Sequence, residues 1–307
     1  MKKILAWVLA LSLLLCGAAF AEEAEEVHVK VGVVGENNEQ WEQVIIPTLA
    51  EEGIIIELVK FSDYIIPNQA LAQGEIDMNA FQHYDFMNNW NEENSAAYGV
   101  TLVGLCDTLI APLCIYSDKI TSLDELKEGD QIAIMNDVVN EARALRMLAS
   151  TGLITLSEDS TELATVADIV ENPLGLEFVE MEAALTPTAM KDPAIAIAFL
   201  NGTHAKDAGL TNDQALLVEE FDFDDESMHG IVNNIAVRAD DIDNPVYQRI
   251  AEVYQSDEVR ALFDTVYAGV YLPAWEAADE ATEATDEATE AADEAADEAE
   301  TEEPAAE

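Results

Sequence analysis

One short segment combines a single arginine with two amides at helical spacing. Arg143 follows Asn136 and Asn140 in a chain that has only 13 lysines and arginines among its 307 residues. Residues three and four positions apart share one face of a helix, so these three side chains can converge at the start of a helix. A guanidinium there can hold a carboxylate through two charge-assisted hydrogen bonds. Equally, Arg143 can pair with one of the many acidic side chains of the chain itself.

A second segment gathers rings and an imidazole. Residues 79–86 read NAFQHYDF and begin within an apolar stretch, Ile76–Phe81, which predicts a short strand. Tyr84, Phe86 and the imidazole of His83 would then lie just past the carboxyl end of that strand. In open α/β sheets this edge is where ligands bind. The segment therefore indicates a binding slot lined with rings.

The motifs that usually carry catalysis or metal binding are missing from the sequence. It contains no Gly-x-Ser-x-Gly, no His-Glu-x-x-His and no phosphate-cradling Gly-x-x-x-x-Gly-Lys. The acidic run 222–226 lacks the glycine that an EF-hand loop needs at its sixth position. The histidines are too scattered to suggest a zinc site: His28, His83, His204 and His229. We therefore expect no enzyme, no metal site and no cofactor.

Two series of strands and helices must position these segments. In the first series, the spacing of apolar residues predicts strands over 27–34, 54–61 and 76–81, with helices over 39–52 and 64–73. A β-α-β-α-β order with crossovers of about a dozen residues predicts a parallel sheet that is covered by helices.

The second series has more and shorter elements. Ser122 and Glu125 resemble a capping box, which predicts a helix from Leu123. Further strands are predicted over 101–105, 113–116, 131–135, 176–180 and 232–237, further helices over 137–151, 245–254 and 257–267, and an apolar run covers 194–200. The folded part is expected to end near Trp275.

The N-terminus predicts export. Two lysines, an apolar stretch over residues 4–15 and small residues before the junction describe a signal peptide, residues 1–21, with cleavage after Ala21. An uncleaved membrane anchor is the alternative, because the apolar character continues almost to the junction. Leu15 precedes Cys16, whereas acylated lipoproteins usually carry a small residue there. Ordinary cleavage is therefore favoured over lipidation, and we expect an extracytoplasmic protein.

Export also predicts an oxidising compartment, so the two cysteines of the mature chain bear on the fold. In an extended strand, Cys106 and Cys114 would lie about 26 Å apart, far beyond the separation that a disulfide needs. A bridge requires a sharp turn between them, and two free, buried thiols are the other interpretation.

The charge limits the partners of the chain. With 63 acidic and 13 basic residues, the net charge is −50, so nucleic acid and anionic lipid would be repelled. Residues 276–307 contain 15 carboxylates and no base, which predicts a solvated, disordered tail. A spacer or cation-collecting segment is the functional alternative for this tail.

In these segments the chain resembles the methionine-binding (MetQ/NlpA-type) lipoprotein family, the solute receptors of ATP-driven methionine importers. The resemblance extends in order from Val27 to Trp275. Its most specific parts are Asn79-Ala80-Phe81-Gln82-His83 and the stretch from Asn136-Asp137 to Arg143. Other matching parts are Phe61-Ser62-Asp63-Tyr64, Pro67-Asn68-Gln69-Ala70-Leu71, Glu171-Asn172-Pro173, Asn201 with His204-Ala205, Val232-Asn233 and Pro273-Ala274-Trp275.

The resemblance implies an α/β fold of the periplasmic-binding-protein-like (type II) kind. In it, two α/β lobes are joined by two hinge crossings, with the ligand site between them. One lobe would comprise residues 27–108 plus 232–275, and the other residues 109–231, with hinges near 108–112 and near Ile231. The implied ligand-binding residues are Tyr64, Phe81, His83 and Phe86 around the ligand's side chain, Arg143 on its carboxylate, and Asn140, Asn201 and Asn233 on its polar end.

The implied function is that of a monomeric solute-binding protein that captures methionine and delivers it to an ABC importer. Its partners would be L-methionine, the permease of the importer and the ATPase of the importer. The alternatives are another small apolar amino acid, D-methionine, a methionine-containing dipeptide, or a surface interaction protein that uses the acidic tail. Two features depart from the family pattern: Phe86 stands where a tyrosine is usual, and the lipobox at Cys16 is missing.

Overall fold

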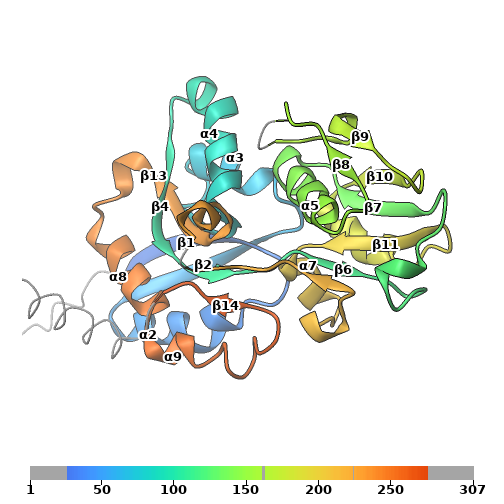
Figure 1. Ribbon diagram of the computed structural model, residues 1–307. Helices are drawn as coiled ribbons and strands as arrows, with labels where there is room; N and C mark the ends of the chain where they lie inside the picture. The colour runs from blue at the N-terminus through green and yellow to red at the C-terminus, as the bar shows by residue number, and fades with distance from the viewer. Residues whose placement is uncertain (1–25, 161–162, 224, 276–307) are drawn as a thin grey trace, which may run out of the picture.

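The computed structural model describes residues 26–160, 163–223 and 225–275. The expected signal peptide, 1–21, and acidic tail, 276–307, both lie outside the described residues. Within them, the chain forms two α/β lobes side by side, each built around a five-stranded sheet (Figure 1). The two-lobed α/β architecture predicted from the sequence is therefore confirmed.

The first sheet combines strands from both ends of the chain. Its three predicted strands are parallel, since β1 pairs in parallel with both β2 and β3. A strand from near the C-terminus, β13, is inserted antiparallel between β3 and β4, so the sheet is mixed. Its order is β2 (Ile54–Phe61), β1 (Val27–Val34), β3 (Met78–His83), β13 (Asn233–Arg238) and β4 (Leu102–Asp107).

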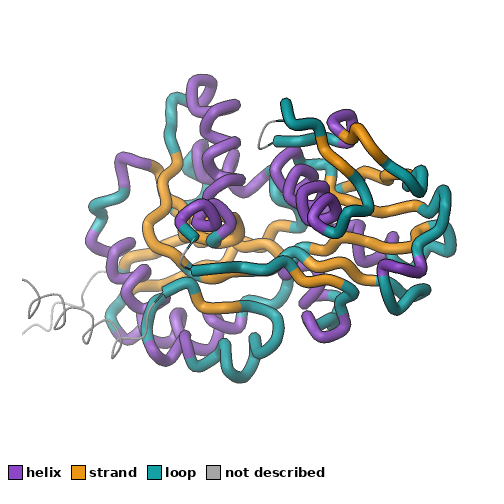
Figure 2. The backbone as a smooth tube through the Cα atoms, viewed as in Figure 1, coloured by secondary structure: helices purple, strands orange, loops and turns teal. Residues whose placement is uncertain are grey.

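Helices cover both faces of the first sheet (Figure 2). Alternate residues of β1, Val29, Val31 and Val33, are buried against Trp41 and Tyr254 on one face. The helices that cover this face are η1 (Trp41–Ile45, a π-helix), α2 (Ile46–Glu51), α8 (Pro245–Tyr254) and α9 (Asp257–Arg260). The other face is covered by α3 (Ile66–Ala72) and α4 (Tyr84–Tyr98). A single turn, η7 (Ala239–Asp241), follows β13.

The second sheet uses one continuous stretch of chain. Its order is β10 (Glu177–Met181), β7 (Gln131–Met135), β11 (Ile195–Leu200), β6 (Cys114–Tyr116) and β12 (Leu217–Val218). Strand β7 is parallel to both neighbours, and β6 is antiparallel to both of its own. The helices of this lobe are α5 (Val138–Ser150), α6 (Thr186–Ala189) and α7 (Gly202–Asp207), with short turns η2 (Leu123–Glu125), η3 (Val166–Asp168), η4 (Ala183–Leu185), η5 (Asn212–Gln214) and η6 (Glu226–Ile231).

Two small sheets complete the fold. Strand β8 (Thr155–Leu156) pairs with β9 (Ile169–Glu171) in the second lobe. Strand β5 (Leu109–Ile110) pairs with β14 (Leu272–Pro273) from the end of the described chain. Because β5 is tied to β14, the chain leaves the first lobe only after Ile110, and it returns through η6 into β13.

Helices α6 and α7 were not predicted from the sequence, and three other helices also differ from the expectation. No helix was expected over α4, whose 15 residues are rich in asparagine and bury only Met87 and Trp90, so its apolar periodicity is weak. The helix predicted from Leu123 is a single 3₁₀ turn, in which Ser122 accepts from the N–H of Asp124 and Glu125 accepts from Thr121. The helix predicted over 257–267 ends at Arg260, beyond which the chain continues in turns.

Candidate functional site

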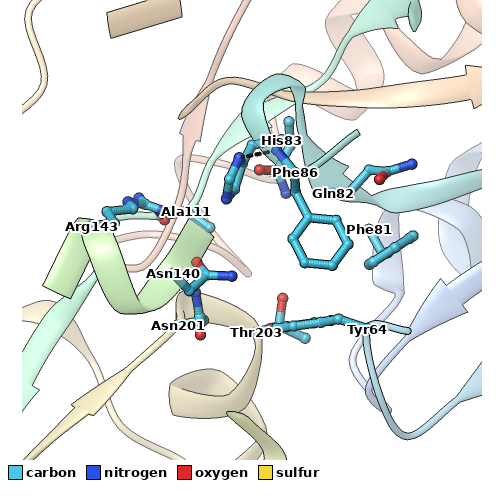
Figure 3. Close-up of a pocket in the computed structure, with 11 residues that line it drawn as sticks. Tyr64, Phe81, Gln82, His83, Phe86, Ala111, Asn140, Arg143, Asn201 and Thr203 are labelled. Carbon is cyan, nitrogen blue, oxygen red and sulfur yellow. Dashed lines mark hydrogen bonds between the residues drawn. The ribbon is translucent and has the colours of Figure 1, made fainter. Parts of the chain in front are cut away.

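A small cavity lies between the two lobes. Its lining includes all eight residues expected to bind a ligand, together with three that the sequence did not single out. The lining residues are Tyr64, Phe81, Gln82, His83, Phe86, Ala111, Asn140, Arg143, Asn201, Thr203 and Asn233 (Figure 3).

Three rings form the wall of the cavity on the side of the first lobe. Tyr64 stacks on Phe81 with ring centroids 5.8 Å apart, and Phe86 meets Tyr64 edge-on at 6.2 Å and Phe81 at 6.0 Å. Strand β3 ends two residues later than predicted, so Phe81 and His83 are strand residues on one face, and Phe86 is in the first turn of α4. The rings therefore surround one end of the cavity (Figure 3).

His83 faces the cavity as a neutral hydrogen-bond donor. It is the N-cap of α4, where its Nδ1 accepts from the backbone N–H of Phe86 at 3.2 Å, so its proton lies on Nε2. Burial, with the charge of Arg143, lowers the pKa of His83 to about 3. Its Nε2 is buried and has no hydrogen-bond partner among the described residues. A ligand oxygen is the missing partner that this geometry favours.

A chain of amides presents an acceptor to the same cavity. Asp137, the N-cap of α5, accepts from the backbone N–H and from Nδ2 of Asn140, each at 2.9 Å. Asn140 is thereby fixed with its Oδ1 toward Asn201, whose Nδ2 donates to it at 2.9 Å. This leaves Oδ1 of Asn201 buried and without a partner in the described chain. The amide relay, which is the row of hydrogen bonds from Asp137 through Asn140 to Asn201, therefore ends in an acceptor without a donor, and an ammonium group could supply that donor.

Arg143 lies at the polar end of the cavity but is already paired. Its Nε donates to Oε1 of Glu219 at 2.6 Å, and its Nη2 donates to the other oxygen of that carboxylate and, at 3.1 Å, to the carbonyl of Ala111. Only 5% of the Arg143 side chain is exposed. Both interpretations of this arginine therefore hold together: it pairs with an acidic residue, and it lines the cavity.

Asn233 lies on the opposite wall from the α5 amides. It is the first residue of β13 and faces His83 across the antiparallel pair. Its carbonyl accepts from the backbone N–H of Thr108 at 2.8 Å, which anchors it beside the crossing between the lobes. Its side chain lines the cavity.

A buried amide network supports the ring wall from behind. Asn68 on α3 donates to Oε1 of Gln82 at 2.7 Å and accepts from both Gln82 and Asn79, at 2.7 and 2.9 Å. Gln82 also donates to Asn79 at 2.9 Å. All three are almost fully buried. Because buried amides are costly unless paired, the network holds β3 in one position beneath Phe81 and His83.

Hydrogen bonds and a salt bridge connect the two lobes outside the cavity. Asp207, at the end of α7, accepts from the backbone N–H of Glu36 at 3.2 Å and from Nδ2 of Asn37 at 2.5 Å. A salt bridge of 3.3 Å joins Lys206 to Glu39. These contacts connect α7 of the second lobe to the loop that follows β1, and they bring the two lobes together around the cavity.

The cysteines and acidic residues form no further site in the described chain. Cys106 on β4 and Cys114 on β6 are both free. Among the described residues, no three histidine, cysteine, aspartate or glutamate side chains gather as metal ligands. No helix within the same residues is sufficiently long and apolar to cross a membrane.

Glu219, which pairs with Arg143, and Thr203, which lines the cavity, are the residues of the candidate site that the sequence did not indicate. Glu219 follows β12, 76 positions after Arg143, and nothing marks it among 63 acidic residues. Thr203 is in the first turn of α7, a helix that was not predicted. Neither residue carries a local signal, because the pairing of β12 with β6 and the packing of α7 create both positions.

Comparison with known proteins gives a consistent result. The model of the NlpA lipoprotein family matches residues 29–275. The D-methionine-binding lipoprotein MetQ of Escherichia coli (strain K12) is 38% identical over 267 residues, which is 87% of this chain and 94% of that protein. The folds of two solved structures also agree with this one, and both support the periplasmic-binding-protein-like architecture.

One of these structures is the substrate-binding protein of a methionine transporter from Streptococcus pneumoniae. It is 34% identical, with a TM-score of 0.74, over 81% of this chain and 96% of that chain. The other is a nutrient-binding protein from Burkholderia cenocepacia bound to methionine. It is also 34% identical, with a TM-score of 0.73, over 80% of this chain and 100% of that chain.

Proposed function

The chain belongs to the NlpA lipoprotein family, and we propose that it is an exported solute-binding protein that captures methionine and delivers it to an ABC importer. The observation that carries this proposal is the cavity between the lobes, which combines a ring-lined end with unpartnered polar atoms of both kinds. Its support from relatives is direct, because one solved relative holds methionine and another serves a methionine transporter.

A methionine zwitterion matches the polar end of the cavity. Its carboxylate would accept from Nε2 of His83, which is buried without a partner, and from the guanidinium of Arg143, which lines the cavity. Its ammonium would donate to Oδ1 of Asn201, with Asn233 nearby as a further amide. Buried polar groups need such partners, so a ligand without both charges would leave part of this set unsatisfied.

The ring-lined end suits the thioether. A sulfur about 5 Å from an aromatic ring gains roughly 0.3–1.5 kcal/mol per contact. Tyr64, Phe81 and Phe86 contact one another, with ring centroids about 6 Å apart, and so present one continuous apolar wall to the cavity. A long unbranched side chain can lie along such a wall in contact with more than one ring.

Capture would proceed by closure of the two lobes, which hinge after Ile110 and near Ile231. The ring wall lies on the first lobe, and the amide relay with Arg143 lies on the second. Only the closed form lets both contact the ligand, so binding shifts the population toward closure. The closed protein, as a monomer, would then dock on the permease of the importer, which works with its ATPase.

D-Methionine is the second candidate ligand, because the Escherichia coli relative is named for it. Both enantiomers carry the same charges and the same thioether, so the cavity's chemistry accommodates either one. They differ only in which direction the side chain leaves the charged centre.

The test is the identification and rebinding of the natural ligand. The exported chain, residues 22–307, is purified, and the small molecules that it carries are released and identified by mass spectrometry. Calorimetry on the refolded, ligand-free chain then compares L-methionine, D-methionine and leucine. We expect methionine in the released material and tighter binding of methionine than of leucine. Absence of binding by both enantiomers would overturn the proposal.

A further inference from the structure

The pairing of Arg143 with Glu219 is part of the cavity's wall rather than a surface contact. The side chains are 5% and 14% exposed, and the carboxylate takes both Nε and Nη2 of the guanidinium. Oε2 of Glu219 also accepts from the backbone N–H of Leu113 at 3.1 Å. The carboxylate is therefore held in place from two sides, immediately behind the cation that faces the cavity.

This pairing removes the net charge from the cavity. Arg143 is the one cationic side chain in its lining, His83 is neutral, and the other lining residues are amides, rings and small side chains. Glu219 cancels the charge of Arg143, and Asp137 lies behind Asn140 as a second carboxyl group. A ligand that brings a net negative charge would therefore enter a site that holds no excess positive charge to balance it.

We propose that Glu219 makes the site selective for net-neutral zwitterions over anions of the same shape, by compensating the charge of Arg143 and fixing its orientation. This inference rests on the proposed function, since it assumes an amino-acid ligand whose carboxylate faces Arg143. An α-hydroxy acid keeps the carboxylate and the side chain but lacks the ammonium. In the site, the hydroxy acid would add a second carboxylate beside that of Glu219, and no second cation would balance its charge. Its hydroxyl would take the place of the ammonium group that donates to Oδ1 of Asn201.

Removal of the carboxylate reverses this balance. With glutamine at position 219, the charge of Arg143 is free to be balanced by the ligand's own carboxylate. Methionine gains less from this change than the hydroxy acid, because its ammonium then faces a more positive site. The preference between the two ligands reports on the charge of the pair, whereas a merely structural role of Glu219 would weaken both ligands alike.

The experiment measures the affinities of L-methionine and of 2-hydroxy-4-(methylthio)butanoate for the full exported chain by competition calorimetry. Glu219→Gln is the test variant, and Glu220→Gln is the matched control, because Glu220 is the exposed neighbour. We expect the wild type and Glu220→Gln to prefer methionine equally. In Glu219→Gln the ratio of the two affinities should fall at least tenfold, with tighter binding of the hydroxy acid than in the wild type.

Glu219→Ala, which leaves room for water in place of the carboxylate, provides a second charge-removing variant if the glutamine disturbs folding. An unchanged ratio in a folded variant would overturn the role of Glu219, and so would an equal loss for both ligands. A wild-type chain that binds neither methionine enantiomer would instead overturn the proposed function. The two failures are therefore distinguishable.

Discussion

Replacement of His83 by asparagine separates the binding role of this residue from its structural one. The imidazole has two tasks: Nδ1 caps α4 by accepting from the N–H of Phe86, and Nε2 offers a proton to the cavity. Asparagine is among the best N-cap residues, so the helix keeps its cap. Its short side chain cannot also extend a donor into the cavity.

The structure allows the size of the effect to be worked out. A hydrogen bond to a charged group contributes roughly 1.5–3 kcal/mol, and each 1.4 kcal/mol is about a factor of ten in affinity. We therefore expect His83→Asn to weaken methionine binding by about 10- to 150-fold. Stability at pH 8, where both side chains are neutral, should change by less than about 1 kcal/mol, since the loss of an N-cap is typically worth about that much.

The assay is calorimetric titration of the ligand-free chain with L-methionine, together with thermal unfolding of each variant. His28→Asn is the matched control, because the side chain of His28 is 70% exposed and does not line the cavity. Its affinity should equal that of the wild type. Methionine binding by His83→Asn within twofold of the wild type would refute the assignment of Nε2 as a ligand donor.

Three further predictions concern pH, closure and the buried amides. The pKa of His83 is lowered to about 3 in the folded chain and is about 6.5 in an unfolded one, so its contribution to stability should be complete above pH 6.5 and be lost as the pH falls from 6.5 toward 3. Methionine affinity should stay constant from pH 5 to 8. Thermal melts check the first expectation, and calorimetry checks the second. Asp207→Asn weakens exposed contacts to Glu36 and Asn37, so methionine should dissociate about two- to fivefold faster in stopped-flow displacement, and an unchanged rate would count against a role in closure. Asn68→Leu leaves the buried amides of Gln82 and Asn79 without their hydrogen-bond partner, so urea titration should show a free energy of unfolding that is lower by about 2–4 kcal/mol. A loss below about 1 kcal/mol would contradict the stabilising role of this network.

The parts of the site that were predictable from residue spacing are those built locally. Asp137 caps α5, and the convergence of Asn140 and Arg143 then follows from helical geometry. Asn136, which was expected to join them, precedes the cap, is exposed and does not line the cavity. The alternation of Phe81 and His83 on one strand is similarly local. Their common cavity with Asn201 and Asn233 was expected only from the family resemblance.

The parts that were missed depend on contacts between distant segments. Glu219 meets Arg143 because β12 joins the edge of β6, and one acidic residue among many gives no sign of such a partner. Helix α4 was missed because it turns a largely polar surface outward and buries two large residues, which leaves little apolar periodicity to read. The reversed direction of β13 likewise depends on which edge of the first sheet remained open.

The insertion of β13 also bears on how the chain acquires its shape during export. The second sheet takes its strands from one uninterrupted stretch between residues 114 and 218, whereas β3 and β4 are joined only when residues 233–238 arrive. A polypeptide that emerges N-terminus first therefore has unpaired strand edges in its first lobe until most of its length has crossed. In the export that we propose, the cavity between the lobes would therefore be completed only after residues 233–238 have crossed the membrane.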